Sequence, residues 1–173
     1  MRGRHWPEPP GTGRSVSRVI PRAVLLILIA VLLAAWQQGL ARVAAAAAAA
    51  SAAQGNVAAN WALRQIGKPY RWAAAGPGAF DCSGLTMRAW QRAGVRLGHF
   101  TGWQWTSGPH VPLNRLRRGD LVFFATNTAK PSTIHHVGVY IGRGKMVDAP
   151  HTGARVRIET IYEPGLIGAT RPA

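Results

Sequence analysis

Acidic side chains and cysteine are the scarcest functional groups in this sequence. Its 173 residues include only six Asp and Glu against 21 Lys and Arg, and a single cysteine, Cys82. One cysteine cannot form a disulfide within the chain, and no cysteine–histidine spacing typical of a zinc site occurs. Neither a disulfide nor a structural zinc site therefore accounts for Cys82.

An uninterrupted apolar run of membrane-spanning length is also missing. Residues 23–36 form an apolar run of 14 residues, whereas a membrane-spanning helix needs about 20 and the core of a signal peptide about 7–15. Arginines precede the run, and residues 41–55 offer many small residues to a signal peptidase. The pattern favours a cleaved signal peptide, with a mature chain that starts between about Ala44 and Gly55.

An uncleaved N-terminal anchor is the alternative. Residues 19–40, counted with the alanine-rich stretch that follows, form a longer and mostly apolar segment, and the alanine-rich part could serve as a helical spacer. No cysteine lies near the run, which excludes a lipid-anchored lipoprotein. We assign residues 1–54 to a signal peptide or membrane anchor with its alanine-rich spacer, and residues 55–173 to one domain.

The predicted domain is strongly basic. Residues 55–173 carry a net charge of +10, and the cations are scattered rather than gathered in blocks. A basic exported domain attracts anionic cell-wall polymers, lipid surfaces or nucleic acid, although the charge can also simply keep the surface soluble. No RNA- or DNA-binding motif is present, so nucleic acid is not an expected partner.

Helices come first in this domain, and strands follow. Apolar spacing and turn residues predict helices over residues 56–67, 81–94 and 100–107. Asp81 is the expected N-cap of the second helix, and Gly94 is its expected stop. Short runs rich in β-branched residues predict strands over residues 120–125, 135–142, 145–150, 154–159 and 166–171. This order predicts an α+β fold, with N-terminal helices packed on an antiparallel sheet of five or six strands.

Cys82 lies at the predicted start of the second helix. Exposed backbone N–H groups and the positive end of the helix dipole favour a thiolate at such a position. The simpler interpretation is a small buried apolar residue, which is what most lone cysteines are. The polar neighbours Asp81 and Ser83, with Gly84 removing side-chain bulk, favour a nucleophile instead.

A thiolate nucleophile needs a base and a group that orients the base. The histidines outside the export segment and outside loop-like sequence around His99 and His110 are His135, His136 and His151. Alternation along the strand puts His136 on one face with Gly138, which leaves room for the cysteine helix to approach. His151 follows a strand end, from which it could reach the other ring nitrogen of His136. Each histidine taken alone could equally be a hydrogen-bonded surface residue.

Five sequence blocks occur in an order and spacing that resemble the NlpC-type (NlpC/P60) family of bacterial cell-wall cysteine peptidases. The resemblance covers about residues 56–170, and its blocks are GKPYRW, FDCSGLT, LRRGDLVFF, HHVGVYIG and MVDAPHTGARV. It implies a papain-like core with a Cys-His-His arrangement. Cys82 matches the nucleophile, His136 the base and His151 the orienting residue.

The resemblance also implies a substrate and further site residues. Tyr70 matches a tyrosine that contributes to the oxyanion hole, and Asp81 and Ser83 match residues that bind the free amine of the substrate. The implied reaction is hydrolysis of an amide bond in peptidoglycan stem peptides, between D-glutamate, through its γ-carboxyl, and a diamino acid. No metal or organic cofactor is implied, and we expect a monomer that is secreted or held at the cell envelope.

Two alternatives stay open. One is a non-catalytic wall-binding or scaffold protein that keeps the fold, and the other is an enzyme that cleaves or transfers a different acyl group. Two departures from the family pattern bear on the site: Ala73–Ala75 replaces paired glycines, which puts the loop shape in question, and Arg118 replaces a proline at a surface turn, where we expect little effect.

Overall fold

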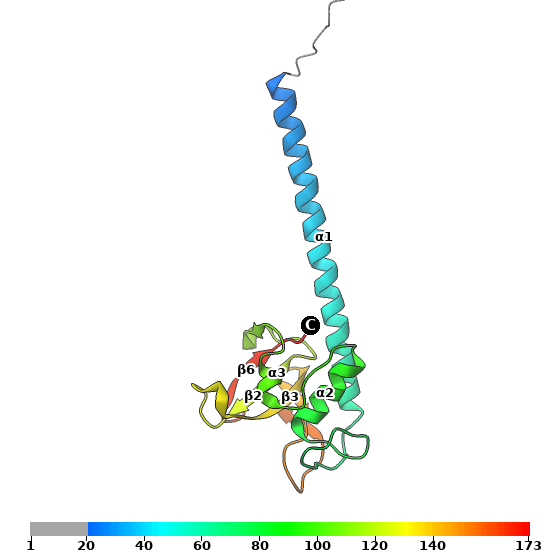
Figure 1. Cartoon of the computed structure of the whole chain (residues 1–173), viewed down its shortest axis with the longest axis vertical. Coiled ribbons are helices and arrows are strands. Elements are labelled where there is room, and N and C mark those ends of the chain that lie inside the picture. Colours follow the sequence, from blue (N-terminus) through cyan, green and yellow to red (C-terminus); the bar gives the residue numbers. More distant parts are fainter. Residues whose placement is uncertain (1–20) are drawn as a thin grey trace, which may run out of the picture. The chain divides into compact units, whose positions relative to one another are not determined.

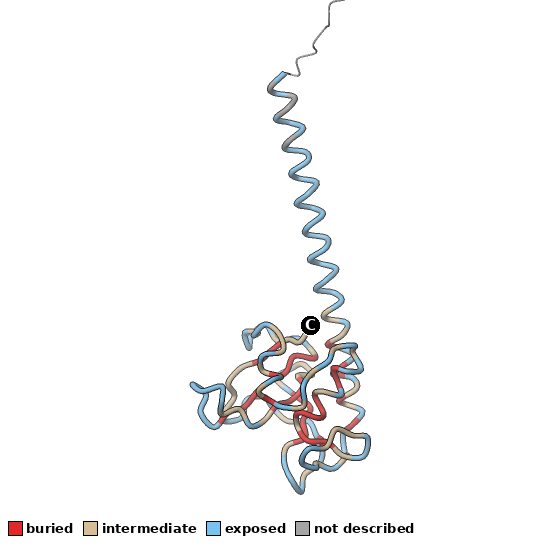
Figure 2. Tube along the Cα trace, viewed as in Figure 1, coloured by how far each residue is buried: buried red, intermediate tan, exposed pale blue. Residues whose placement is uncertain are grey.

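The computed structural model describes residues 21–173, and the chain divides into two compact units between Val43 and Ala44. One helix, α1 (Arg22–Leu63), runs from the first unit into the second (Figure 1). Its described N-terminal residues are exposed (Figure 2). By length and composition alone, the stretch Leu26–Leu63 is long and apolar enough to cross a membrane. The alanine-rich segment lies within α1 and is helical. The helix predicted over residues 56–67 is the C-terminal end of α1, which ends at Leu63.

The second unit combines helices with one antiparallel sheet (Figure 1). The helices that follow α1 are α2 (Cys82–Arg92) and α3 (Thr101–Trp105), with 3-10 turns at Leu113–Arg115 and Pro131–Thr133. The strands are β1 (His110–Val111), β2 (Leu121–Ala125), β3 (Ile134–Gly142), β4 (Lys145–Asp148), β5 (Arg157–Thr160) and β6 (Leu166–Thr170). They are ordered β1-β6-β2-β3-β4-β5. The predicted α+β class and strand number are confirmed.

One strand was not predicted from the sequence. β1 has only two residues, and it pairs with β6 through His110 and Thr170. Two residues show no periodicity, so only the pairing identifies this strand. At the opposite edge of the sheet, β5 begins at Arg157, three residues later than the predicted start at residue 154.

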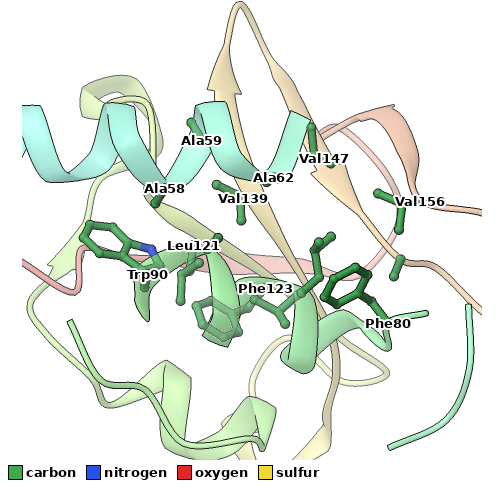
Figure 3. Packing of buried hydrophobic residues seen from close by; sticks show 14 residues of the cluster. Ala58, Ala59, Ala62, Phe80, Trp90, Leu121, Phe123, Val139, Val147 and Val156 are labelled. Atoms are coloured by element: carbon green, nitrogen blue, oxygen red, sulfur yellow. The ribbon is translucent and has the colours of Figure 1, made fainter. Parts of the chain in front are cut away.

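The helices bury small residues against the sheet. Ala58, Ala59 and Ala62 of α1 are fully buried and lie in one cluster with the sheet residues Val139 and Val147 (Figure 3). Small alanine side chains let the helix backbone approach the strands closely. From α2, Leu85, Ala89 and Trp90 join the same cluster, whereas its N-terminal turn presents polar groups. This packing holds α2 against the sheet, in contact with β3 and β4.

Arg118 joins α1 to the sheet. Its guanidinium donates hydrogen bonds to the side-chain oxygens of Asn56 (3.2 Å) and Asn60 (2.6 Å) on α1, and to the carbonyl oxygen of Ile141 on β3 (2.6 Å). The α1 backbone comes close here, because a Cβ at Gly55 would overlap the Arg118 carbonyl. The Arg118 side chain thus bonds to two elements across the turn where the sequence predicted little effect.

The loop that carries Ala73–Ala75 is held at both ends. Ala73 adopts a φ of 56°, in the left-handed region that favours glycine. The Ala74 carbonyl accepts a hydrogen bond from the Asp81 N–H (2.8 Å), and the Ala75 carbonyl accepts one from Arg88 (2.8 Å). These bonds secure the loop against α2 although alanine replaces glycine at a position with positive φ.

Candidate active site

The start of α2 places Cys82 at the N-terminus of a helix. Asp81 is the N-cap, as predicted, with an extended backbone and a carboxylate that accepts a hydrogen bond from the Gly84 N–H at 2.6 Å. Cys82 follows as the first helical residue and is half-buried. A Cβ at Gly84 would overlap the Ala74 carbonyl, so only glycine lets the loop pack here. The cap and the glycine together fix the direction in which the Cys82 side chain leaves the helix.

The base candidate His136 lies on β3. It pairs across the sheet with Phe124, and the centroids of the two rings are 5.8 Å apart. Its side chain is 15% exposed, so most of the imidazole is removed from water. The room beside Gly138 is taken by Met146 and Asp148 of β4 and not by the cysteine helix, which corrects that part of the sequence analysis.

Asp148 is the hydrogen-bond partner of His136. Its Oδ2 lies 2.8 Å from His136 Nε2, and its side chain is fully buried. Because β3 and β4 pair antiparallel through Val139 and Val147, alternation puts Asp148 on the same face as His136.

His151 does not occupy the predicted position beside His136. It is exposed, and its Nδ1 lies 2.9 Å from the carbonyl oxygen of its neighbour Thr152. The correction has a simple cause: β4 ends at Asp148, and the chain then turns away from the sheet before it reaches His151. Alternation within KMVD, which places Met146 and Asp148 on one face, was the signal in the sequence that could have identified Asp148.

The environment of His136 favours its protonated form. Burial lowers the pKa of His136, but hydrogen bonds with Asp148 and Cys82, and the negative charges of both, raise it to about 9. Burial also raises the pKa of Asp148, a shift that the hydrogen bond from His136 opposes and the charge of Glu159 reinforces. Because Asp148 occupies Nε2, the other ring nitrogen, Nδ1, is left for Cys82. The structure therefore brings Cys82, His136 and Asp148 together.

Tyr70 lies within electrostatic reach of Cys82. Burial raises the pKa of the Tyr70 hydroxyl, and the charges of Cys82 and Asp81 raise it further. A raised pKa keeps the hydroxyl protonated at neutral pH, so it is available as a hydrogen-bond donor. Its backbone is fixed by a hydrogen bond from the Tyr70 N–H to the carbonyl of Ala154 (2.9 Å).

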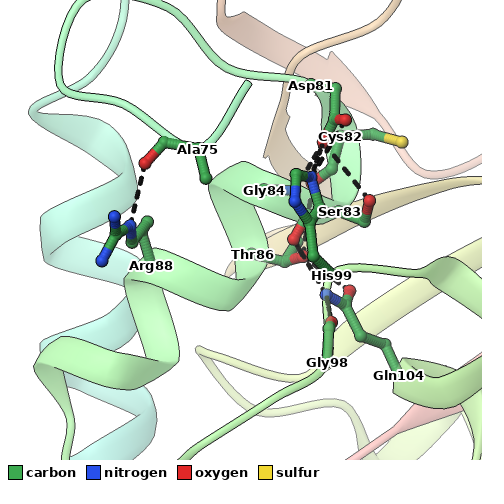
Figure 4. Close-up of polar contacts among 10 residues, drawn as sticks. All are labelled: Ala75, Asp81, Cys82, Ser83, Gly84, Thr86, Arg88, Gly98, His99 and Gln104. Atoms are coloured by element: carbon green, nitrogen blue, oxygen red, sulfur yellow. Dashed lines mark hydrogen bonds and ion pairs between the residues drawn. The ribbon is translucent and has the colours of Figure 1, made fainter. Parts of the chain in front are cut away.

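His99 is a member of the site that sequence reasoning missed. Its Nε2 lies 2.8 Å from Oδ1 and 3.0 Å from Oδ2 of Asp81, and the Ser83 hydroxyl donates to the same carboxylate at 3.3 Å. Figure 4 shows these contacts, with the Cys82 side chain directed away from them. His99 stands in loop-like sequence 18 residues after Asp81, so no local pattern connects the two.

Two pockets flank the cysteine–histidine pair. One, of about 330 Å³, is lined by Cys82, Asp81 and Ser83 together with residues of the loops around it. The other, of about 290 Å³, is lined by His136, and His135 lines both. Within the part of the chain that the structure describes, no cluster of three or more His, Cys, Asp or Glu residues could hold a metal ion. The arrangement is suited to attack by a thiolate with a histidine as proton carrier.

Comparison with known proteins agrees with this geometry. The model of the NlpC/P60 family matches residues 67–171, which include every residue of the site described above. Among solved structures, the peptidoglycan hydrolase RipB from Mycobacterium tuberculosis superposes with a TM-score of 0.62 at 30% identity, over 72% of this chain and 67% of that one. The expected papain-like core is confirmed by such neighbours.

Curated relatives include a peptidoglycan endopeptidase and a dipeptidyl-peptidase. The peptidoglycan endopeptidase RipA of Mycolicibacterium smegmatis is 35% identical over 117 residues, 60% of this chain and 22% of the relative. The gamma-D-glutamyl-L-lysine dipeptidyl-peptidase of Bacillus subtilis is 40% identical over 110 residues, 61% of this chain and 37% of the relative. The chain thus spans well under half the length of these relatives, and the similarity lies in the domain that holds the site.

Proposed function

Because the chain belongs to the NlpC/P60 family, we propose that it is a cysteine-type peptidoglycan hydrolase that cleaves an amide bond in stem peptides. The observation that carries this proposal is geometric: the buried Asp148 carboxylate lies 2.8 Å from His136 Nε2, and Cys82 occupies the first position of α2 beside His136. A histidine that keeps its proton beside a cysteine at a helix N-terminus supports a thiolate–imidazolium pair. Peptidoglycan as the substrate is supported by the relatives with peptidoglycan activity.

In the proposed reaction the Cys82 thiolate attacks the amide carbonyl carbon and forms a carbon–sulfur bond. The Cys82 N–H at the helix start and the Tyr70 hydroxyl donate to the resulting oxyanion; one such donor is typically worth about 10²–10³ in rate. His136 gives its proton from Nδ1 to the leaving nitrogen, and the carbon–nitrogen bond breaks. Water then attacks the thioester and His136 takes one of its protons. The carbon–sulfur bond breaks, so the thiolate re-forms, and the product leaves as a carboxylic acid that loses its proton to solvent.

Asp148 takes the orienting role in this proposal in place of His151. A buried carboxylate on Nε2 holds the imidazole in one orientation and stabilises its charged form. We further propose that the bond cleaved joins D-glutamate, through its γ-carboxyl, to a diamino acid, because the Bacillus subtilis relative is named for that linkage with lysine.

The proposed location is the outer face of the cytoplasmic membrane or the cell wall. The basic N-terminal sequence followed by the apolar part of α1 fits either a signal peptide or an anchor. N-terminal sequencing of protein from the culture medium and from membranes decides between the two. A first residue between about Ala44 and Gly55 is expected for cleavage, and an intact N-terminus found only in membranes would establish the anchor.

Digestion of defined muropeptides tests the proposed activity. Wild-type protein is expected to release products that correspond by mass to cleavage of one stem-peptide amide, and Cys82→Ala is expected to release none. His135→Ala should keep most of the activity, because His135 is exposed and is not the base, and His110→Ala is the matched control, because this exposed histidine on β1 lines neither pocket. Binding of muropeptides by the wild type without any turnover would favour the wall-binding alternative and contradict this proposal.

A further inference from the structure

A further cavity lies between the end of α1, α2 and the loop that precedes α2. Its volume is about 510 Å³, and among the residues that the structure describes it shares none with the two pockets beside Cys82 and His136. Its walls come from Trp61 near the end of α1, from Arg88 and its neighbours on α2, and from residues 75–77 of the loop. The proposed reaction makes no use of this cavity.

Three basic side chains, Lys68, Arg88 and Arg92, line this cavity, which we call the basic cavity. Arg88, Gln91 and Arg92 stand at i, i+3 and i+4, on one face of α2. Arg88 Nη1 donates a hydrogen bond to Oε1 of Gln91, and Lys68 Nζ donates one to Oε1 of Gln65, each at 2.7 Å. These neutral amide oxygens hold two of the cations in place and leave their charges uncancelled.

No acidic side chain within residues 21–173 lines the basic cavity. Of the five Asp and Glu in that range, four contact other basic side chains, and Glu163 lines the pocket at His136. A hollow lined by one sign of charge concentrates the electrostatic potential and attracts ions of the opposite sign. The basic cavity is therefore suited to an anion.

Aromatic rings form the apolar part of the wall. Trp61 and Phe80 pack edge-to-face, with ring centroids 5.7 Å apart, and Lys68 Nζ lies 5.6 Å from the centre of the Phe80 ring. Phe80 is buried and Trp61 half-buried, so the core holds both rings in place. Apolar walls lower the local dielectric constant, which strengthens the attraction between a bound anion and the cations.

One loop borders both the basic cavity and the catalytic pocket. Arg88 Nε donates a hydrogen bond to the Ala75 carbonyl at 2.8 Å (Figure 4). Ala75 lines the basic cavity, whereas Trp72 and Ala73 of the same loop line the pocket that contains Cys82. A polymer bound at Arg88 is therefore held next to the loop that shapes the catalytic pocket.

A phosphodiester fits the basic cavity better than other anionic groups. Its tetrahedral oxygens accept hydrogen bonds from cations that converge from different elements, whereas a planar carboxylate suits a single guanidinium. A lipid phosphate is favoured where apolar side chains beside it enter the membrane. Within the described part of the chain, none of the large exposed apolar residues lines this cavity.

We infer that the basic cavity is a second binding site of the domain, which takes the phosphodiester groups of an anionic polymer of the cell wall. The inference goes beyond the proposed function, because it assigns a ligand to a cavity that takes no part in hydrolysis. The wall is the source we infer because the domain has a net charge of +10 and its proposed location is the cell envelope. Binding at this site keeps the enzyme close to the wall.

Calorimetric titration of the full-length, inactive Cys82→Ala protein tests the inference without hydrolysis. The probe is a synthetic glycerol-phosphate oligomer, compared with a glutamate oligomer and a single-stranded DNA oligomer of the same charge. The glycerol-phosphate oligomer should bind at least about tenfold more tightly than the glutamate oligomer, and added salt should weaken its binding. No binding of the glycerol-phosphate oligomer, or equal or tighter binding of either comparison oligomer, would overturn the inference.

Charge-matched variants separate the basic cavity from general basic character. Lys68→Gln/Arg92→Gln should weaken binding of the glycerol-phosphate oligomer by at least about tenfold. Lys145→Gln/Arg96→Gln removes the same charges from exposed positions outside the cavity and should weaken it by less than about threefold. Arg92→Gln alone should cost about threefold against Arg96→Gln, and this pair serves if the double variant does not fold. Equal losses in the two double variants would assign binding to net charge and contradict the inference.

Two further measurements locate the ligand and its source. Amide hydrogen exchange with the glycerol-phosphate oligomer should slow in residues 71–80 and 88–92, and protection confined to other segments would overturn the assignment. Vesicles that contain phosphatidylglycerol should bind the cavity double variant as tightly as its charge-matched control, and a selective loss in the cavity variant would make a lipid the ligand instead. All of these readouts measure binding by an inactive protein, so they stand or fail independently of the proposed hydrolysis.

Discussion

Asp148 on β4 and His136 on β3 face each other across two neighbouring strands, with Oδ2 and Nε2 2.8 Å apart. The carboxylate is fully buried and the imidazole nearly so. A buried carboxylate is costly without a hydrogen-bond donor, so the hydrogen bond with His136 stabilises Asp148 and also fixes the orientation of the imidazole. In the proposed mechanism this contact gives the positioning role to Asp148 and not to His151.

Asp148→Asn should reduce kcat/KM on a muropeptide by at least about 10²-fold, because the amide can neither stabilise an imidazolium nor select its tautomer. His151→Ala should stay within about threefold of the wild type, since His151 is exposed and its imidazole is hydrogen-bonded to the carbonyl of Thr152 and not to His136. The measurement is steady-state hydrolysis followed by chromatography. A larger loss at His151 than at Asp148 would return the orienting role to His151, as predicted from the sequence.

The activity should fall on the alkaline side as His136 loses its proton. The pKa of His136 is raised to about 9, so the imidazolium that protonates the leaving nitrogen persists below that pH and disappears above it. The alkaline limb of the kcat/KM profile should therefore lie near pH 9. In Asp148→Asn the limb should move to lower pH, because Asp148 helps to raise the pKa of His136. An alkaline limb that is the same in both proteins would assign it to another group.

Ala73→Gly should stabilise the domain by roughly 0.5–1 kcal/mol. Ala73 has a φ of 56°, where a Cβ is strained and glycine is not, and this local gain outweighs the extra freedom of glycine in the unfolded chain. Urea unfolding of both proteins measures the difference. Ala75→Gly is the control: Ala75 has no positive φ, so the same substitution should leave stability unchanged or lower it. Destabilisation by Ala73→Gly would show that the alanine methyl contributes packing.

Arg118→Ala should lower the free energy of unfolding by about 1–3 kcal/mol, because it removes charge-assisted hydrogen bonds that tie α1 to β3. Arg118→Pro should cost at least as much, although the family resemblance puts proline at this position. Arg96→Ala offers a control at an exposed arginine in the segment between α2 and α3. Equal stability of the Arg118 and Arg96 variants would mean that the three hydrogen bonds contribute nothing net.

Local sequence signals predicted the parts of the site that depend on neighbours along the chain. The N-cap Asp81, the cysteine after it and the glycine stop of α2 form one contiguous segment, so the start and end of the helix could be predicted from local signals. Alternation in HHVGVYIG likewise separated His136 from His135, because the side-chain period of a strand is two. The family resemblance then added what the segments do together, including the papain-like core.

Only the tertiary structure decided the partners that come from different elements. Asp148 rather than His151 reaches His136 because the register of β4 on β3 and the end of β4 set which side chain lies beside the imidazole. His99 reaches Asp81 because a buried network around Gln104 folds its loop onto α2. Arg118 bonds to both α1 and β3 because the fold brings these two elements, distant in sequence, to the same turn. Such contacts join residues 12 to 62 positions apart, and no local periodicity encodes a distance in space.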